Sequence, residues 1–310
     1  MPWRWSCAAK RASSVPSGNP EGRPAPGLTL PRGGVTPREA FLVLPGLNLH
    51  PHRLDPLSAL LNEAGAATLV PHLTGFATPG DAALRRVSAE RWLADVDAAW
   101  RAARARLPGA EPSLLGYSLG ALLGLVWARQ AGVALRRAIL LSPALRLRPL
   151  HRALLLGLGA LLPGALRLPS RAPVTYRFHA GTTVAAYRAL AHLERCLQAT
   201  LDAWTHGQDA PPPLLIACSP DDELIATRPL ARLARAFPQR VTLVPLSHEP
   251  RPGFPAHLGL DAYTLGEREW QRLTDTLRRW LREEIPAPPQ AAPAAPAGGG
   301  PPGPDREAAP

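Results

Sequence analysis

The stretch Leu114-Leu115-Gly116-Tyr117-Ser118-Leu119-Gly120-Ala121 has the order of a short apolar strand, a Gly-x-Ser-x-Gly turn and the start of a helix rich in alanine and leucine. This order is typical of a nucleophile elbow, in which a sharp strand-to-helix turn pushes a serine hydroxyl clear of the backbone. Gly116 and Gly120 fit that pattern because larger side chains there would clash with the neighbouring strand or helix. Ser118 would lie at a helix N-terminus, where free N–H groups favour developing negative charge. A small-residue turn with a solvent-facing serine is the alternative, and the rest of the chain must decide.

The composition of this 310-residue chain limits the other classes of function. Its net charge is +11, and almost all the positive charge is arginine, since Lys10 is the sole lysine. The sequence has no basic run of five to eight residues, and only 5% of it is aromatic, so we expect no nucleic-acid partner. Cys7, Cys196 and Cys218 form no Cys-x-x-Cys pair, which argues against a disulfide framework or a zinc site and fits a reducing compartment. We expect no metal and no cofactor.

The two ends of the sequence differ from its middle. Residues 1–38 are rich in Pro, Gly, Ser and Arg without periodicity, and we interpret them as a disordered or non-native extension. Residues 285–310 are a Pro/Ala/Gly-rich stretch, interpreted as a disordered tail. No apolar segment has the form of a signal peptide or the length of a spanning helix. The sequence therefore predicts a cytoplasmic protein.

Between the ends, short apolar runs alternate with helical patterns. This alternation predicts an α/β fold, with a mostly parallel sheet of about six strands and helices on both faces. The expected strands are residues 40–44, 67–70, the elbow strand ending at 117, 137–143 with its exit loop, 213–219 and 241–244. Ligands of such sheets bind at the carboxyl ends of the strands, where the polar loops of this sequence also fall.

Two further residues complete a candidate catalytic triad with Ser118. Asp222 comes just past the fifth predicted strand, and His248 comes just past the sixth, 248 − 222 = 26 residues later. The order serine, acid, histidine is the one expected for this type of sheet, with His248 as general base and Asp222 fixing its tautomer. The alternatives are a solvated acidic turn around Asp221, Asp222 and Glu223, and a surface histidine at 248.

The oxyanion hole of such a site would be built from backbone N–H groups. The residue after the nucleophile, Leu119, would supply one N–H group. Leu47, in the loop after the first predicted strand, would supply the other. Backbone donors leave no side-chain signature, so these two assignments rest on position.

Four motifs give the chain a specific resemblance: Leu44-Pro45-Gly46-Leu47, Gly116-Tyr117-Ser118-Leu119-Gly120, Asp222-Glu223-Leu224-Ile225 and Ser247-His248. Over about residues 40–284 it resembles α/β-hydrolase-fold carboxylesterases and monoacylglycerol-lipase-like serine hydrolases. The resemblance implies an α/β-hydrolase fold and hydrolysis of apolar, lipid-like esters through an acyl-enzyme. It favours Asp222 over Asp221, because the family acid is typically followed by an acidic residue and two aliphatic ones.

The sequence also departs from that family in two places. Pro45-Gly46 stands where His-Gly is usual before the oxyanion residue, and Gly75-Phe76-Ala77 stands where many members have Gly-His-Gly. The chain also lacks room for the usual N-terminal strand pair, which is why we expect only about six strands. Both motif departures lie near the expected pocket and leave the substrate open.

The predicted domain plan has a core of residues 39–145 and 209–284 with a helical cap insert, residues 146–208. The insert contains the uncharged run Leu154–Leu162, preceded by Arg146, Arg148 and Arg152. One interpretation is a helix packed onto the core; the other is an acyl-binding lid that contacts lipid or membrane surfaces transiently. The expected partner is a small apolar ester. A thioesterase or acyltransferase on the same triad, and a non-catalytic binding protein, are the alternatives; the sequence leaves the oligomeric state open.

Overall fold

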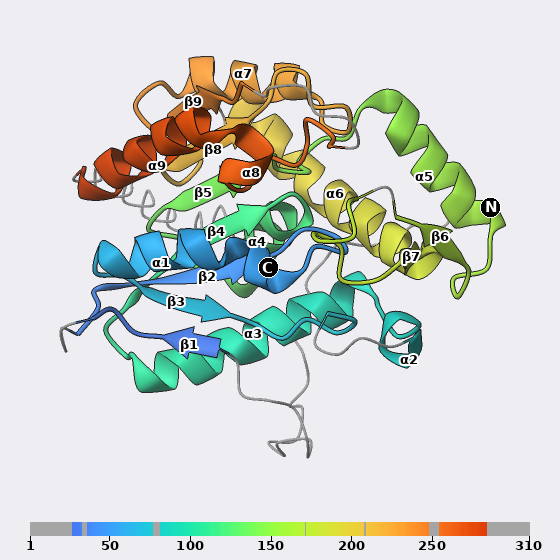
Figure 1. The fold of residues 1–310 in the computed structure, drawn as a ribbon, viewed down its shortest axis with the longest axis horizontal. Coiled ribbons are helices and arrows are strands. Elements are labelled where there is room, and N and C mark those ends of the chain that lie inside the picture. Colours follow the sequence, from blue (N-terminus) through green and yellow to red (C-terminus); the bar gives the residue numbers. More distant parts are fainter. Residues whose placement is uncertain are drawn as a thin grey trace, which may run out of the picture.

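A seven-stranded sheet runs through the centre of the computed structural model, which describes residues 27–32, 36–76, 81–170, 172–207, 209–247 and 254–283 (Figure 1). The strand order is β1-β3-β2-β4-β5-β8-β9, with β1 antiparallel to β3 and every other neighbouring pair parallel. The strands are β1 Gly27–Thr29, β2 Glu39–Leu44, β3 Ala67–Val70, β4 Glu111–Tyr117, β5 Ala138–Leu141, β8 Leu214–Cys218 and β9 Val241–Pro245. The six parallel strands are those predicted from the sequence.

The sheet is buried on both faces because neighbouring residues of its strands enter two separate cores. In β2, Leu42 and Leu44 belong to one core, whereas Phe41 and Val43 belong to the other. Two layers of helices cover these faces (Figure 1). The helices of the first layer are α2 Asp81–Leu84, α3 Ala89–Arg106, α4 Leu119–Ala131, α6 Val184–Thr205 and α7 Thr227–Ala236. Those of the second are the 3-10 turn η1 Pro51–Leu54, α1 Asp55–Glu63, α8 Ala262–Leu265 and α9 Glu267–Arg282.

One strand corrects the sequence prediction. β1 lies inside residues 1–38, the segment we expected to be disordered, and pairs Gly27, Leu28 and Thr29 with the outer side of β3. It makes the sheet seven strands wide instead of about six. Three residues in an edge strand need only backbone hydrogen bonds and one partly buried leucine, so no apolar run announces the strand in the sequence. The predicted tail, residues 285–310, lies outside the described residues.

The insert divides into two parts. Helix α6 is packed into the first helical layer, with Leu193 and Leu197 buried in the same core as α4. Helix α5, Pro149–Leu161, lies on the outside of α6 (Figure 1). Between these two helices in the sequence, the strands β6 Arg167–Pro169 and β7 Gly181–Thr183 form a separate two-stranded antiparallel sheet. Whether residues 146–208 act as a cap stays a prediction.

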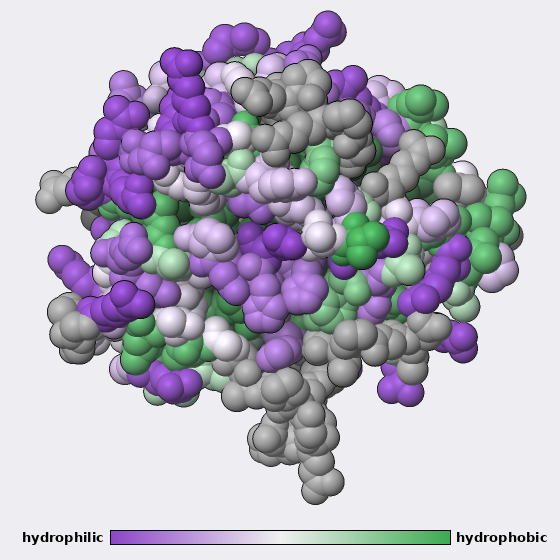
Figure 2. Space-filling view, viewed as in Figure 1, coloured by the Kyte–Doolittle hydropathy of each residue, from purple (hydrophilic) through white to green (hydrophobic). Residues whose placement is uncertain are grey.

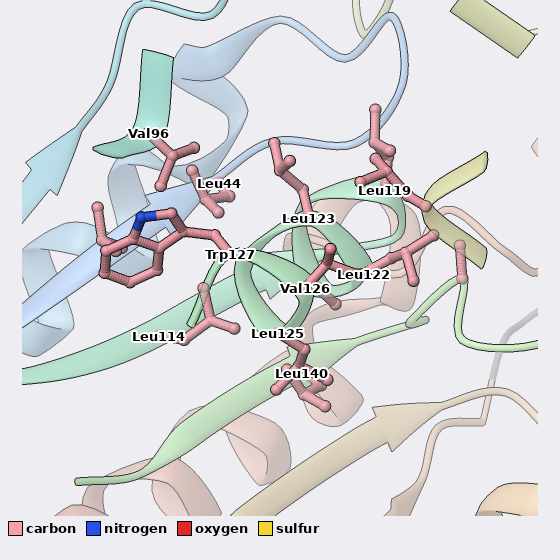
Figure 3. Packing of buried hydrophobic residues seen from close by; sticks show 14 of the residues in the cluster. Leu44, Val96, Leu114, Leu119, Leu122, Leu123, Leu125, Val126, Trp127 and Leu140 are labelled. Carbon is pink, nitrogen blue, oxygen red and sulfur yellow. The ribbon is translucent and has the colours of Figure 1, made fainter. Parts of the chain in front are cut away.

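Helix α4 is buried along most of its length and carries the strand-to-helix turn at its start (Figure 3). Leu122, Leu123 and Leu125 are almost fully enclosed, and Trp127 packs among Leu44, Val96 and Leu114 from three other elements. Gly124 allows this close approach, since a Cβ atom there would lie 2.4 Å from Cδ1 of Leu114.

The contact at Gly124 gives a test of the fold. Gly124→Ala should lower the free energy of unfolding, because overpacking a filled core costs about 1–3 kcal/mol while the helix-propensity gain is about 1 kcal/mol. The matched change Gly157→Ala, in exposed α5 with no atom near the added methyl, should be neutral or stabilising. Chemical denaturation of both variants measures the difference. A stabilised Gly124→Ala protein would contradict this packing.

Candidate active site

Ser118 lies between β4 and α4 in a strained backbone conformation. Its φ is 50° and its ψ is −112°, a combination that residues other than glycine rarely adopt. A Cβ atom on Gly116 would lie 2.4 Å from Cα of Ala121, and one on Gly120 would lie 2.0 Å from the carbonyl oxygen of Leu44. The two glycines are therefore required, as the sequence predicts, and the tight turn holds the Ser118 side chain at the carboxyl edge of the sheet.

Asp222 follows β8 and is fully buried. Its Oδ1 accepts hydrogen bonds from the backbone N–H groups of Leu224 and Ile225, both at 2.9 Å. These donors fix the carboxylate and leave Oδ2 directed at an imidazole. The neighbouring Asp221 is exposed. The structure thus brings Asp222, and not Asp221, to the site.

The imidazole at Asp222 belongs to His257. Its Nδ1 lies 2.8 Å from Oδ2 of Asp222, and its Nε2 lies 2.9 Å from Oγ of Ser118. Because a carboxylate only accepts hydrogen bonds, Nδ1 carries the proton and Nε2 accepts the Ser118 hydroxyl. The three side chains form one continuous hydrogen-bonded series.

His257 replaces His248 in the assignment made from the sequence. His248 lies outside the described residues, so the structure shows nothing of its side chain. The physical reason for the correction is the length of the segment after β9. The histidine that contacts Asp222 comes 257 − 245 = 12 residues after Pro245, the last residue of β9. The signal missed was the apolar pattern after the second histidine, since Leu258 and Leu260 are both buried whereas residues 247–250 are mostly polar.

Two residues to which the sequence analysis gave no role in the site hold the backbone of His257. Its N–H donates to Oε2 of Glu223 at 3.2 Å, and its carbonyl oxygen accepts from Oη of Tyr117 at 3.1 Å. Burial, followed by the negative charges of Asp222 and Glu223, raises the pKa of Tyr117, so the phenol stays protonated as a donor. The imidazole is thus held through both its ring and its main chain.

The loop after β2, residues 45–49, lies against Ser118 and is called the oxyanion loop below, because it contains the predicted donor Leu47. A Cβ atom on Gly46 would lie 2.6 Å from the Tyr117 ring and 3.3 Å from Cβ of Ser118. Gly46 is thus needed at this close approach even though Pro45 stands in place of the usual histidine. Leu47 is the next residue of this loop, and Leu119 is the first residue of α4. The segments that carry the two predicted N–H donors therefore flank Ser118.

The sequence of residues 35–248 matches the family described as serine aminopeptidase, S33. The chain belongs to this family. Three solved structures share the fold. One is of metagenome-derived lipolytic enzymes, at 20% identity and a TM-score of 0.63, covering 84% of this chain and 98% of that one. The second is a soluble variant of monoglyceride lipase from Saccharomyces cerevisiae in complex with a substrate analogue, at 13% identity and a TM-score of 0.63, covering 91% and 98%. The third is a monoacylglycerol lipase from Paleococcus ferrophilus, at 19% identity and a TM-score of 0.56, covering 83% and 98%.

The S33 chain therefore has the α/β-hydrolase fold, and its resemblance to carboxylesterases and monoacylglycerol-lipase-like enzymes is confirmed. A search of curated protein sequences finds no match. In the part of the chain that the structure describes, no helix is both long and apolar enough to cross a bilayer. Within the same residues, no three His, Cys, Asp or Glu side chains gather as a metal site would require.

Cys218, at the end of β8, gives a test of the electrostatics next to Asp222. Burial and, to a smaller extent, the Asp222 carboxylate raise the pKa of its thiol to about 12. Because of this raised pKa, the thiol of Cys218 stays protonated at pH values where an ordinary thiol is ionised. Cys218 should therefore resist iodoacetamide at about pH 9, where an unperturbed thiol of pKa about 8.5 reacts. Peptide mass spectrometry of native and denatured protein measures this. Equal labelling of Cys218 in both states would contradict the buried, neutral thiol.

Proposed function

We propose that this S33 protein is a serine hydrolase that cleaves carboxylic esters through an acyl-enzyme. The observation that carries the proposal is the hydrogen-bonded series from Ser118 through His257 to Asp222 on a strained strand-to-helix turn. The series has the geometry that nucleophilic catalysis by serine needs, with a base in contact with the hydroxyl and an acid in contact with the base. Lipolytic and monoglyceride lipase neighbours support an ester substrate.

The proposed reaction has two halves. Oγ of Ser118 attacks the ester carbonyl carbon while Nε2 of His257 takes the hydroxyl proton, and the carbonyl oxygen becomes an oxyanion. Collapse of this intermediate breaks the bond to the leaving alcohol, which takes the proton from Nε2. Water then attacks the acyl-Ser118 ester, again giving its proton to His257. The second collapse releases the carboxylic acid and returns the proton to Ser118.

Asp222 and two backbone N–H groups support both halves in this proposal. Asp222 holds the Nδ1–H tautomer of His257 and stabilises the imidazolium that forms transiently. The N–H groups of Leu47 and Leu119 would donate to the oxyanion, an interaction that typically contributes about 10²–10³-fold in kcat for one donor. The macrodipole of α4 adds a partial positive charge at the same place.

The outer helix α5 indicates the kind of substrate surface. Leu150, Leu154, Leu156 and Leu161 of this helix are exposed, between 40% for Leu156 and 84% for Leu161. Figure 2 shows apolar surface at the end of the molecule where Figure 1 places α5. Together with a net charge of +11 and arginines at the start of the insert, this surface suits transient contact with lipid or with an anionic membrane. We therefore propose residues 146–208 as the cap and apolar acyl esters as substrates; the cytoplasmic location stays a prediction.

The first test separates the two histidines. His257→Ala should lower kcat on p-nitrophenyl butyrate by about 10⁴–10⁶-fold, because the hydroxyl loses its base. His248→Ala, the matched control, should stay within about threefold of the wild type, a factor of less than 1 kcal/mol.

A parallel comparison tests the acid. Asp222→Asn should lower kcat by about 10³–10⁴-fold through loss of the tautomer, and Asp221→Asn should lower it little. Fluorophosphonate labelling lost in Ser118→Ala would identify the nucleophile. Large loss of activity in His248→Ala with an active His257→Ala would overturn the assignment.

The second test concerns the substrate. Across p-nitrophenyl esters from acetate to palmitate, medium or longer acyl chains should be preferred to acetate. Leu154→Ser with Leu161→Ser should lower the rate on ester vesicles several-fold, since each buried CH₂ is worth about 0.8 kcal/mol, and leave soluble butyrate esters unaffected. Leu30→Ser, on an exposed leucine beside β1, is the control. Equal vesicle rates for all three proteins would exclude the α5 surface.

Other acceptors and bonds can be compared in the same assay. Acyl thioesters test the thioesterase alternative, added alcohols test acyl transfer, and amino acid p-nitroanilides test the peptidase activity after which the S33 family is described. Failure of all esters, with turnover of one of these, would replace ester hydrolysis by that reaction. Absence of fluorophosphonate labelling in the wild type would favour the non-catalytic alternative.

A further inference from the structure

Residues 175–179, between β6 and β7 of the insert, return to the two loops that carry the reactive groups of the site. One is the oxyanion loop, residues 45–49. The other is the segment of residues 254–261, which contains His257 and is called the base loop. In Figure 1 the chain between β6 and β7 passes beside the loop that leaves β2. The contacts on each side are specific and mostly buried.

On the oxyanion side, Asn48 forms a two-way clamp with His179. Its Nδ2 donates to the carbonyl oxygen of His179 at 2.9 Å, and its Oδ1 accepts the N–H of His179 at 2.8 Å. Asn48 is buried and has a φ of 58°, a left-handed conformation that asparagine tolerates better than most residues. The backbone continues the pairing, since the N–H of Phe178 donates to the carbonyl of Asn48 at 2.9 Å.

The pairing continues to His50 on one segment and to Tyr176 on the other. His50 N–H donates to the carbonyl of Tyr176 at 2.8 Å, and Leu49 and Arg177 form an antiparallel bridge. The end of the oxyanion loop thus pairs with the insert as one short strand pairs with another. Leu47 lies one residue before this paired segment, so its N–H direction depends on the register.

On the base side, the contact is made by Tyr176. Its buried hydroxyl donates to the Asp261 carboxylate, with oxygen–oxygen distances of 2.8 and 3.0 Å. Its ring meets the ring of Phe254 edge-on at 6.0 Å. Phe254 and Asp261 stand at the two ends of the base loop, with His257 between them. Asp261 also caps helix α8, accepting the N–H of Thr264 at 2.9 Å.

We propose that residues 175–179 are a positioning element, the brace, which sets the oxyanion loop and the base loop relative to each other. Asn48 and Tyr176 are its positioning residues, and neither needs to touch the substrate. This inference rests on the proposed function, because it concerns the alignment of Leu47 and His257 around Ser118. The proposal also divides the insert by role. The brace is needed for the alignment of the site, whereas the outer helix α5 is not part of the brace.

The experiment is a double-variant comparison of kcat and KM on p-nitrophenyl butyrate. Tyr176→Phe keeps the ring and removes the bond to Asp261; we expect kcat to fall about tenfold, with KM within about twofold, because misplacing a reacting group costs rate more than binding. Asn48→Gly suits the left-handed backbone and removes the clamp; we expect a loss of about 10²-fold, as for one oxyanion donor. The double variant should lose clearly less than the product of the two, since one element carries both effects.

A control variant separates positioning from stability. Asn62→Asp removes an amide that donates to the carbonyl of Ala66, at the end of β3 away from the site. It should leave kcat unchanged, whatever its effect on the melting temperature. Asn48→Asp, which retains the acceptor for His179 N–H but not the donor, should recover part of the activity lost in Asn48→Gly.

The outcomes distinguish the brace from the proposed function. Less-than-multiplicative loss with unchanged KM supports the brace. Purely multiplicative loss means two independent contacts and overturns it, as does wild-type kcat in both single variants. If Asn48→Gly does not fold, Asn48→Asp and Tyr176→Phe form the same comparison. A wild type inactive on every ester overturns the proposed function and the brace together, whereas an active wild type with unaffected variants overturns the brace alone.

Discussion

The site depends on one steric constraint, the close approach of the first turn of α4 to β2. Gly120 lies so near the carbonyl of Leu44 that no side chain fits between them. This approach forces the chain to turn within the single residue Ser118, whose positive φ costs on the order of 1–3 kcal/mol. The cost is offset by the burial of α4, whose leucines and Trp127 fill the core on one face of the sheet. The Ser118 hydroxyl is therefore positioned by the packing of α4 behind it.

The same constraint explains why the neighbouring loops must be tightly held. In the proposed reaction, a serine held by its backbone cannot move to meet its base, so His257 and the oxyanion loop must be placed next to it. His257 is accordingly bound at both ring nitrogens and at both of its backbone polar groups, by Asp222, Ser118, Glu223 and Tyr117. Rigid strands set Ser118 and Asp222. His257, which lies in a long loop, needs these added contacts.

This difference also decides what could be predicted from the sequence. The six parallel strands are predictable because buried strands are continuous apolar runs, and the elbow because its glycines have a steric reason visible in five letters. Asp222 is predictable because it lies in the short turn after β8, which ends at Cys218. His257 is not, because two histidines follow β9 and loop length has no periodicity to rank them. β1 was missed for a related reason: its three residues carry no pattern beyond one leucine between Gly27 and Thr29.

The insert shows why composition alone could not assign its parts. Both α5 and α6 read as apolar helices, but α6 turns its leucines into the core while α5 leaves several exposed. Helix α5 is attached through the partly buried Leu155 and through polar contacts, in which Arg188 of α6 donates to the carbonyls of Gly159 and Leu162 and Arg152 of α5 pairs with the buried Glu194 of α6. The Arg188 contacts are exposed and contribute about 1 kcal/mol or less each, so α5 is held less firmly than α6, whose leucines lie in the core. Changes in α5 can therefore alter the apolar surface presented to a substrate without disturbing the buried contacts of residues 175–179, on which the alignment of the site depends.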